Sequence, residues 1–193
     1  ETTMTFPIIG RINIGVLYPL LFIPIGVVGA ANMVNLLGGL NGLETGMGIV
    51  YIGILGLYAY TNERYIAALI ALMVFVSLIA FFYYNKYPAK ILPGDSLTYF
   101  LGGSLVVIAI VGDIERAAIV LAIPFFIEFI LKARSKFKAD SFGYYKEGKL
   151  HSKYDKIYSL THLFLRTGKF TEKQIVWFFI IIELIISSMV WFV

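Results

Sequence analysis

Residues 65–84 read YIAALIALMVFVSLIAFFYY, a run of apolar side chains without a charged residue. A helix needs about 20 such residues to cross the hydrocarbon core of a bilayer, so this stretch predicts a membrane-spanning helix. The composition agrees, because 59% of the 193 residues are hydrophobic and only 15% are charged. Soluble domains average about 25% charged residues. The sequence therefore predicts an integral membrane protein.

Similar apolar runs elsewhere in the chain predict about six spanning helices in all. They cover residues 14–35, 46–61, 65–84, 97–112, 116–132 and 173–193. The second and fourth runs are short and contain glycine, which fits segments that are buried against other helices or partly re-entrant. The predicted fold is an all-α, polytopic membrane protein with one long polar connection at 133–172. Within that connection, residues 154–165 have the amphipathic pattern of an interfacial helix.

Lysine and arginine gather in this long connection and at its edges, which hold most of the chain's 16 basic residues. Cytoplasmic loops are enriched in these residues, so we expect the connection to be cytoplasmic. Counting spans back from it places the loops at 35–46 and 84–96 on the same side. Three polar loops are thus predicted to meet at the cytoplasmic surface, where we expect the active site.

The first of these loops follows a spanning run and has much hydrogen-bonding capacity: ANMVNLLGGLNGLETGMG, residues 31–48. Asn32 and Asn35 share a helical face, and amide oxygens can ligate a hard cation while amide nitrogens donate to phosphate. The glycines let the backbone turn sharply and present N–H groups to a ligand. Helix capping and close packing would explain the glycines alone. With Asn41 and Glu44 in the same window, we favour a ligand site.

The second loop, NKYPAKILPGDSLTYFLGGSL at 85–105, carries an aspartate just before an apolar span. An ionisable group at that depth is costly and usually functional. Asp95 suits the N-cap of the following helix, and it equally suits a Mg²⁺ ligand. Lys86 and Lys90 flank it and favour an anionic substrate, although lysines are common in any cytoplasmic loop.

The third loop, KARSKFKADSFGYYKEGKLHSKYDK at 132–156, is strongly basic. Such a run alone is most often a solvated surface attracted to anionic lipid. Beside the other two loops, it predicts a phosphate clamp. Two acidic groups lie within predicted spans. Glu128 is expected to pair with Lys132 at the i+4 position, and Glu183 in the last span is expected to face protein or to be protonated.

Two of these stretches resemble known signature motifs. NMVNLLGGLNGLETG is similar to the N-x-x-N-x-x-x-G-x-N-G-L-E-x-G motif of the UDP-GlcNAc:dolichyl-phosphate N-acetylglucosamine-1-phosphate transferase family. YNKYPAKILPGDSLTYFLGG resembles that family's N-x-[YF]-P-[AS]-[KR]-x-[FL]-x-G-D-[ST] loop. Both motifs occur in the family's order, and the similarity runs from Glu1 to the region of Phe129. The "NGLE" form is closer to the archaeal and eukaryotic branch than to the bacterial one.

The resemblance implies that Asn35 and Asp95 form the catalytic pair and hold Mg²⁺, with Mn²⁺ as an alternative. The substrate-binding residues that it implies are Asn32, Gly39, Asn41, Glu44, Asn85, Leu92, Arg134, Lys136, Lys138 and His162. Gly39, Asn41 and Leu92 are expected at the uridine, and the basic residues at the pyrophosphate and the sugar. His162 lies in THLFLRTGKFTE (161–172), which is similar to the histidine loop of the bacterial translocase. An interfacial position is the alternative for this histidine.

The implied reaction is the transfer of GlcNAc-1-phosphate from UDP-GlcNAc to dolichyl or polyprenyl phosphate, with release of UMP. This is the first membrane step in lipid-linked oligosaccharide synthesis for N-glycosylation. Membrane lipid is a further expected partner, a homodimer is left open, and nucleic acid is not expected. The alternatives are a bacterial-type transferase for another UDP-sugar and a non-catalytic module that binds nucleotide sugar or lipid phosphate. A transporter would be favoured by inverted repeats, and none is detectable.

One departure from the family concerns its aspartate-rich motif, because no two adjacent aspartates occur in this sequence. The motif lies in the family's N-terminal half. We therefore expect residues 1–193 to be the C-terminal portion of one integral-membrane domain, completed by the N-terminal half of the same enzyme. Glu1–Gly10 would then be a loop between helices.

Overall fold

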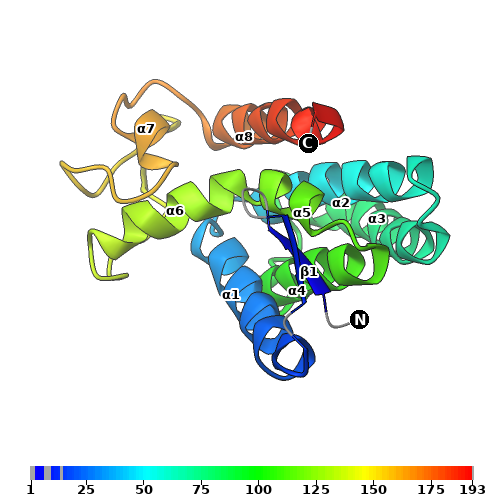
Figure 1. Cartoon of the computed structure of the whole chain (residues 1–193). Coiled ribbons are helices and arrows are strands. Elements are labelled where there is room, and N and C mark those ends of the chain that lie inside the picture. The colour runs from blue at the N-terminus through cyan, green and yellow to red at the C-terminus, as the bar shows by residue number, and fades with distance from the viewer. Residues whose placement is uncertain (1–2, 7–9, 14, 193) are drawn as a thin grey trace.

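The computed structural model describes residues 3–6, 10–13 and 15–192, which are mostly helical (Figure 1). In these residues, five helices are long and apolar enough to cross a membrane. The first, Tyr18–Leu36, begins as the π-helical turn η1 (Tyr18–Phe22) and continues as α1 (Ile23–Leu36). The next three are α2 (Leu43–Thr61), α3 (Tyr65–Asn85) and α4 (Gly94–Gly112). The last is α8 (Glu172–Ser187), which continues into the 3₁₀ turn η2 (Ser188–Phe192). The polytopic, all-α prediction is confirmed. Residue 14, where the first predicted span begins, and residue 193, where the last one ends, lie outside the described residues.

The remaining predicted span, 116–132, is not one continuous helix. The chain forms α5 (Glu115–Leu121) and α6 (Ile123–Ala133), with a break at Ala122. Pro124 explains this break, because proline has no N–H to donate and its ring clashes with the carbonyl four residues earlier. The predicted run is thus helical over almost its whole length, but it is divided into two segments.

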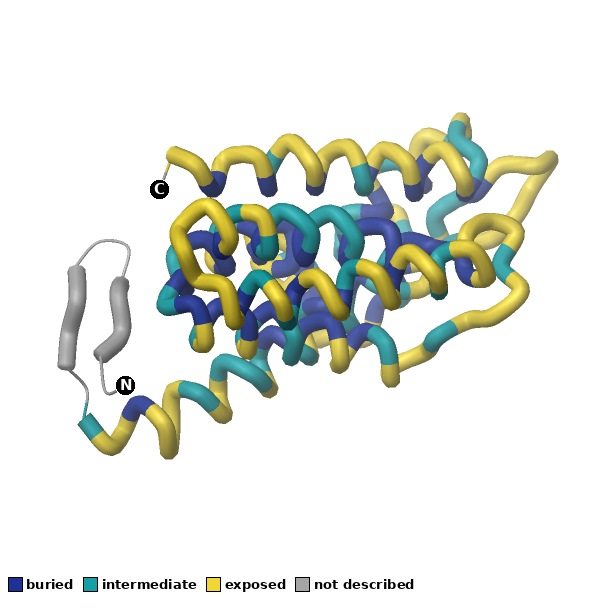
Figure 2. The backbone as a smooth tube through the Cα atoms, turned by 90° about the vertical axis from the view of Figure 1, so that its right-hand side faces the viewer, coloured by how far each residue is buried: buried dark blue, intermediate teal, exposed yellow. Residues whose placement is uncertain are grey.

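The core of the bundle is built around α2, which packs against α3, α4 and α8. Half of its most apolar window is buried, and α4 follows with 39%, as the short, glycine-containing runs predicted. Figure 2 shows buried residues turned inward and exposed residues covering the outside of the helices. Many of the exposed ones are large and apolar, such as Leu69, Leu72 and Val76 on α3. These outer faces suit hydrocarbon rather than water.

Small residues allow close helix crossings. A Cβ atom added to Gly102 of α4 would lie 2.5 Å from the Ala30 carbonyl oxygen and from Ala31 Cα. The backbones of α1 and α4 therefore touch at this point, and only glycine permits this approach. The crossing brings the C-terminal end of α1 beside the N-terminal end of α4.

The long basic connection contains local structure that the sequence did not predict. Strands β3 (Tyr144–Lys146) and β4 (Lys149–His151) form an antiparallel hairpin whose two turn residues, Glu147 and Gly148, both have positive φ. The expected helix at 154–165 is reduced to α7 (His162–Leu165). Near the N-terminus, β1 (Thr3–Phe6) pairs with β2 (Gly10–Asn13) where a loop was expected, while residues 1–2 and 7–9 lie outside the described part.

The helix at 154–165 fails to form because its polar side chains bond elsewhere. The hydroxyls of Ser159 and Thr161 lie 2.9 Å apart, and Thr161 Oγ1 also donates to the Ser141 carbonyl. Side chains that bond to nearby polar groups in this way compete with helical hydrogen bonds. The segment is consequently folded against residues 139–142 instead of lying as a separate interfacial helix.

Candidate functional site

A cavity of about 430 Å³ lies where the three polar loops meet. Its lining comes from the end of α1 and the following loop, from the start of α4, and from the end of α6 and the residues after it. The residues are Asn35, Leu36, Gly38, Gly39, Leu40, Glu44, Leu92, Pro93, Gly94, Asp95, Thr98, Lys132, Ala139, Asp140, Ser141 and Phe142. The predicted convergence of the loops is thus found in the structure. Of the predicted site residues, it brings together Asn35, Gly39, Glu44, Leu92 and Asp95.

The Asn35 amide is held in place by α4. The single hydroxyl hydrogen of Thr98 has two acceptors within reach, Asn35 Oδ1 at an O–O distance of 2.8 Å and the Asp95 carbonyl oxygen at 3.1 Å. Thr98 is buried and one turn after Asp95, so its hydroxyl faces the same side of α4. This contact directs the amide of Asn35 and fixes it relative to the start of α4.

Asp95 lies in the first turn of α4 and is exposed to the cavity. It is not the N-cap, because the helix already begins at Gly94 and Pro93 occupies the cap position. Within the part of the chain that the structure describes, no hydrogen bond or ion pair occupies its carboxylate. Its oxygens are therefore available to a ligand.

The loop between α1 and α2 is shaped by two glycines. Gly39 has φ of 118° and Gly42 has φ of 83°, conformations that other residues rarely adopt. The Gly39 N–H donates to Glu44 Oε1 at 2.7 Å, and the Asn41 N–H donates to Glu172 Oε1 at the same distance. Glu44 thus lines the cavity and also holds the turn beside it.

A network of buried polar groups holds the opposite wall of the cavity, residues 139–142. Glu128 is fully buried, accepts from the Leu160 N–H at 2.7 Å, and lies 3.9 Å from Lys132 Nζ. The predicted pair at i+4 is therefore present. Lys132 Nζ also donates to the Ala139 carbonyl oxygen, and Ser141 Oγ donates to the Leu36 carbonyl oxygen at 2.7 Å. The wall is tied both to α6 and to the end of α1.

His162 supports this wall from behind and does not line the cavity. Its Nδ1 accepts from the Tyr158 N–H at 3.2 Å, so Nε2 carries the proton and donates to the Asp140 carbonyl oxygen at 2.9 Å. The side chain is fully buried, and burial lowers the pKa of the imidazole from its ordinary value of 6.5. Both ring nitrogens are thus used within the protein, which differs from the expected position at the mouth of the site.

Other predicted substrate-binding residues lie outside this cavity as well. Asn85 is buried and links two elements, since Thr45 Oγ1 donates to its Oδ1 and its Nδ2 donates to the Ile91 carbonyl oxygen. Asn32 Nδ2 donates to the Val28 carbonyl oxygen, one turn back in α1. Asn85 thus joins α2 to the loop after α3, whereas the Asn32 amide bonds within α1.

The predicted basic clamp is also placed differently. Arg134, Lys136 and Lys138 are exposed to solvent, and Arg134 donates to the Ile157 carbonyl oxygen at 3.3 Å. Lys132 is instead the cation that lines the cavity. Asn41 lines a neighbouring cavity of about 280 Å³, together with Lys86, Tyr87, Lys173, Trp177 and three apolar residues.

Sequence reasoning missed several residues of the cavity, chiefly Thr98, Asp140, Ser141 and Phe142. A signal was present for Thr98, which follows Asp95 at the i+3 spacing of one helical face. For the other three there was none, because their position depends on how the long connection folds back.

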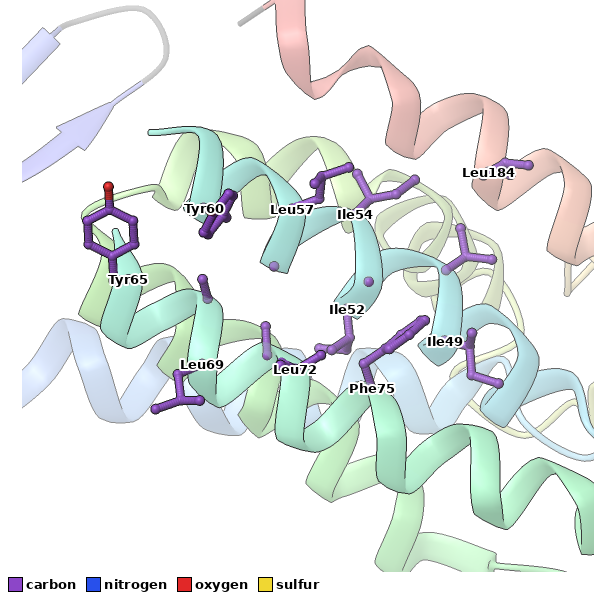
Figure 3. Close-up of a pocket in the computed structure, with 15 residues that line it drawn as sticks. Ile49, Ile52, Ile54, Leu57, Tyr60, Tyr65, Leu69, Leu72, Phe75 and Leu184 are labelled. Atoms are coloured by element: carbon purple, nitrogen blue, oxygen red, sulfur yellow. The ribbon is translucent and has the colours of Figure 1, made fainter. Parts of the chain in front are cut away.

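A larger apolar groove of about 670 Å³ runs between α2 and α3 (Figure 3). Ile49, Leu57, Leu72 and Phe75 line it, and its polar side-chain atoms are the hydroxyls of Tyr60 and Tyr65. Tyrosines at the end of a span are typical of the membrane interface. The groove has no group that could bind phosphate or metal, so we place the chemistry in the smaller, polar cavity.

Comparison with known proteins identifies the family. Residues 1–113, which include the α1–α2 loop and Asp95, match the family described as glycosyl transferase family 4. The chain belongs to glycosyl transferase family 4. The resemblance seen in the two motifs is thereby confirmed.

Several relatives are similar over most of the chain. One, from Saccharolobus solfataricus, is provisionally named a UDP-N-acetylglucosamine–dolichyl-phosphate N-acetylglucosaminephosphotransferase; it is 42% identical over 179 residues, 91% of this chain and 55% of that protein. A protein of the same name from Sulfolobus acidocaldarius is 38% identical over 91% of this chain and 54% of its own length. A phospho-N-acetylmuramoyl-pentapeptide-transferase from Lactiplantibacillus plantarum is 38% identical over 65% of this chain and 39% of its own. The family 4 chain thus spans about half the length of the first two relatives.

Proposed function

We propose that this chain carries the metal and nucleotide-sugar site of an enzyme that transfers GlcNAc-1-phosphate from UDP-GlcNAc to dolichyl or polyprenyl phosphate. The main support is the single cavity that contains both Asn35, from the end of α1, and Asp95, from the start of α4. The names of the two archaeal relatives give the donor and the acceptor.

The donor set of the cavity suits a hard divalent cation. The Asn35 amide oxygen and the Asp95 carboxylate are oxygen ligands of the kind Mg²⁺ binds, and Mn²⁺ is the alternative. The described residues contain no cluster of three or more histidine, cysteine or acidic side chains that would enclose a metal. This agrees with Mg²⁺, which usually takes one or two protein carboxylates and completes its shell with water and substrate phosphate. When bound, the ion would supply Lewis-acid charge neutralisation.

The reaction needs positioning and charge stabilisation more than covalent help from the protein. An oxygen of the lipid phosphate attacks the β-phosphorus of UDP-GlcNAc, the bond from this phosphorus to the bridging oxygen breaks, and UMP leaves with that oxygen. The Lys132 ammonium and the start of α4 provide positive charge at the cavity for the phosphoryl oxygens. Thr98 keeps the Asn35 amide oxygen facing its ligand.

The membrane setting follows from the same proposal. The polyprenyl chain lies among the apolar helices while its phosphate reaches the cavity from the cytoplasmic side, which the basic loop marks. Residues 1–193 act as the C-terminal portion of a single domain, and the N-terminal half of the enzyme completes the site. A homodimer is compatible with this arrangement.

The test is UMP release by the full-length protein in membranes, with dolichyl phosphate and a panel of UDP-sugars that includes UDP-GlcNAc and UDP-MurNAc-pentapeptide. We expect UDP-GlcNAc to be used, and Asp95→Asn and Asn35→Ala to abolish the metal-dependent turnover while the protein remains inserted. Use of UDP-MurNAc-pentapeptide instead would favour a bacterial-type transferase, which the match to the Lactiplantibacillus plantarum protein makes the second candidate. Nucleotide binding without any turnover would indicate a non-catalytic module.

A further inference from the structure

The α1–α2 loop is anchored from the far end of the chain. Its Asn41 N–H donates to Glu172 Oε1 at 2.7 Å across 131 positions of sequence. The neighbouring Gly39 N–H has a local acceptor, Glu44, at the start of α2. Glycines on either side of Asn41 leave the backbone free to turn. The two carboxylates therefore decide which conformation this loop adopts.

Glu172 is itself held rigidly. It is buried in the first turn of α8. A capping box fixes this helix end, since Gln174 N–H donates to Thr171 Oγ1 and Thr171 N–H donates to Gln174 Oε1. The Phe170 carbonyl oxygen accepts from the Leu150 N–H at 3.0 Å, which joins the same point to β4. The anchor of the loop is thus a fixed part of the C-terminal fold.

We propose that Glu172 is a positioning residue for the nucleotide sugar, acting through Asn41. Its charge-assisted hydrogen bond fixes the backbone of Asn41 while the side chain faces the cavity of about 280 Å³ that Lys86 and Lys173 also line. An amide in that position can donate and accept hydrogen bonds, as a nucleotide base requires. This inference rests on the proposed function, because it assigns the ligand as UDP-GlcNAc.

The two proposed metal ligands do not depend on the hydrogen bond between Asn41 and Glu172. Asn35 and Asp95 line the other cavity, where Thr98 connects them. Loss of Glu172 should therefore weaken substrate binding much more than the chemical step. The effect is expected in KM, whereas kcat changes little.

The experiment compares Glu172→Ala and Glu172→Gln in the full-length protein, with Glu147→Gln on the exposed hairpin turn as a control for lost charge. A lost hydrogen bond to a charged group predicts that Glu172→Ala raises KM for UDP-GlcNAc about ten-fold or more. Glu172→Gln retains an acceptor oxygen and should recover most of the affinity. If Gln and Ala are equally impaired, or if Ala matches the parent, the positioning role is refuted.

Two further measurements separate positioning from a general structural role. In an Asn41→Ala background, Glu172→Ala should add little to KM, because its effect passes through that side chain; full additivity would refute the proposal. Hydrogen exchange at the Asn41 amide should lose protection in Glu172→Ala, and unchanged protection would disprove the anchor. The exchange experiment needs no turnover. If the parent does not bind UDP-GlcNAc, the proposed function fails while the anchor is still tested.

Discussion

Removal of the Thr98 hydroxyl should weaken metal use without removing a metal ligand. Thr98→Val keeps the shape of the side chain but deletes the 2.8 Å hydrogen bond to Asn35 Oδ1. A net hydrogen bond contributes about 0.5–1.5 kcal/mol, and leaving a buried partner unsatisfied costs about 1–3 kcal/mol. Thr98 is only 2% exposed, so water replaces the hydroxyl poorly. A loss of about 1–2 kcal/mol corresponds to a factor of about 5–30 in the Mg²⁺ concentration that gives half-maximal rate.

The assay is the initial rate of UMP release against Mg²⁺ concentration at saturating UDP-GlcNAc and lipid phosphate. Thr98→Ser is the matched control, because it keeps the hydroxyl and loses only a methyl group. We expect the serine variant to stay near the parent while the valine variant shifts to higher Mg²⁺. An unchanged Mg²⁺ dependence in Thr98→Val would show that this contact does not orient the amide. An equal shift in both variants would assign the effect to packing instead.

Three further predictions concern stability. Gly102→Val should force α1 away from α4 and cost about 1–3 kcal/mol, seen as a Tm several degrees lower in detergent; Gly103→Ala, whose added Cβ would meet only one atom at 4.0 Å, should melt like the parent. Glu128→Ala leaves a buried lysine without its carboxylate and should cost about 3–5 kcal/mol, so that the connection after α6 is cut faster by protease, whereas Glu147→Ala should have no such effect. Burial lowers the pKa of His162 below 6.5 while the imidazole is packed behind the cavity wall at 139–142. The state in which the wall is detached and His162 is exposed therefore binds a proton more readily, so acid favours detachment of the wall. Hydrogen-exchange protection of the cavity wall, corrected for intrinsic rates, should be constant between pH 7 and 8 and fall below about pH 6.5; a flat profile down to pH 5 would contradict this.

The apolar helices were predictable because each can be recognised from the hydropathy of its own segment, without knowledge of its neighbours. A run such as residues 65–84 must cross a bilayer whatever its neighbours are, and α3 begins and ends within one residue of that range. The break at Ala122 was also readable in principle, since Pro124 lies inside the predicted span. Hydropathy alone masked it, because proline does not lower the apolar character of its surroundings enough.

The cavity was predictable only in part. Asn35 and Asp95 stand at the ends of spans whose order already fixes which membrane surface they reach. The supporting polar groups are different, because their roles depend on the path of the long basic connection. Glu-Gly is a weak hairpin signal compared with Asn-Gly, so the turn at Gly148 was not expected. The resemblance likewise implied the exposed Lys136 rather than the buried Lys132, since a motif match takes no account of burial.

The two sides of the cavity are held mainly by different elements, and this has an evolutionary consequence. The side with Asn35 and Asp95 is set by the contact of two spanning helices, whereas the wall at 139–142 is held by α6 through Glu128 and Lys132. Its one link to α1 is the hydrogen bond from Ser141 Oγ to the Leu36 carbonyl oxygen. Recombination between relatives could therefore exchange the wall as one unit while Asn35 and Asp95 stay in place, because the link to α1 uses a backbone carbonyl that any residue supplies. Chimeras that keep both α6 residues would show, in the UMP-release assay, whether the wall selects the donor.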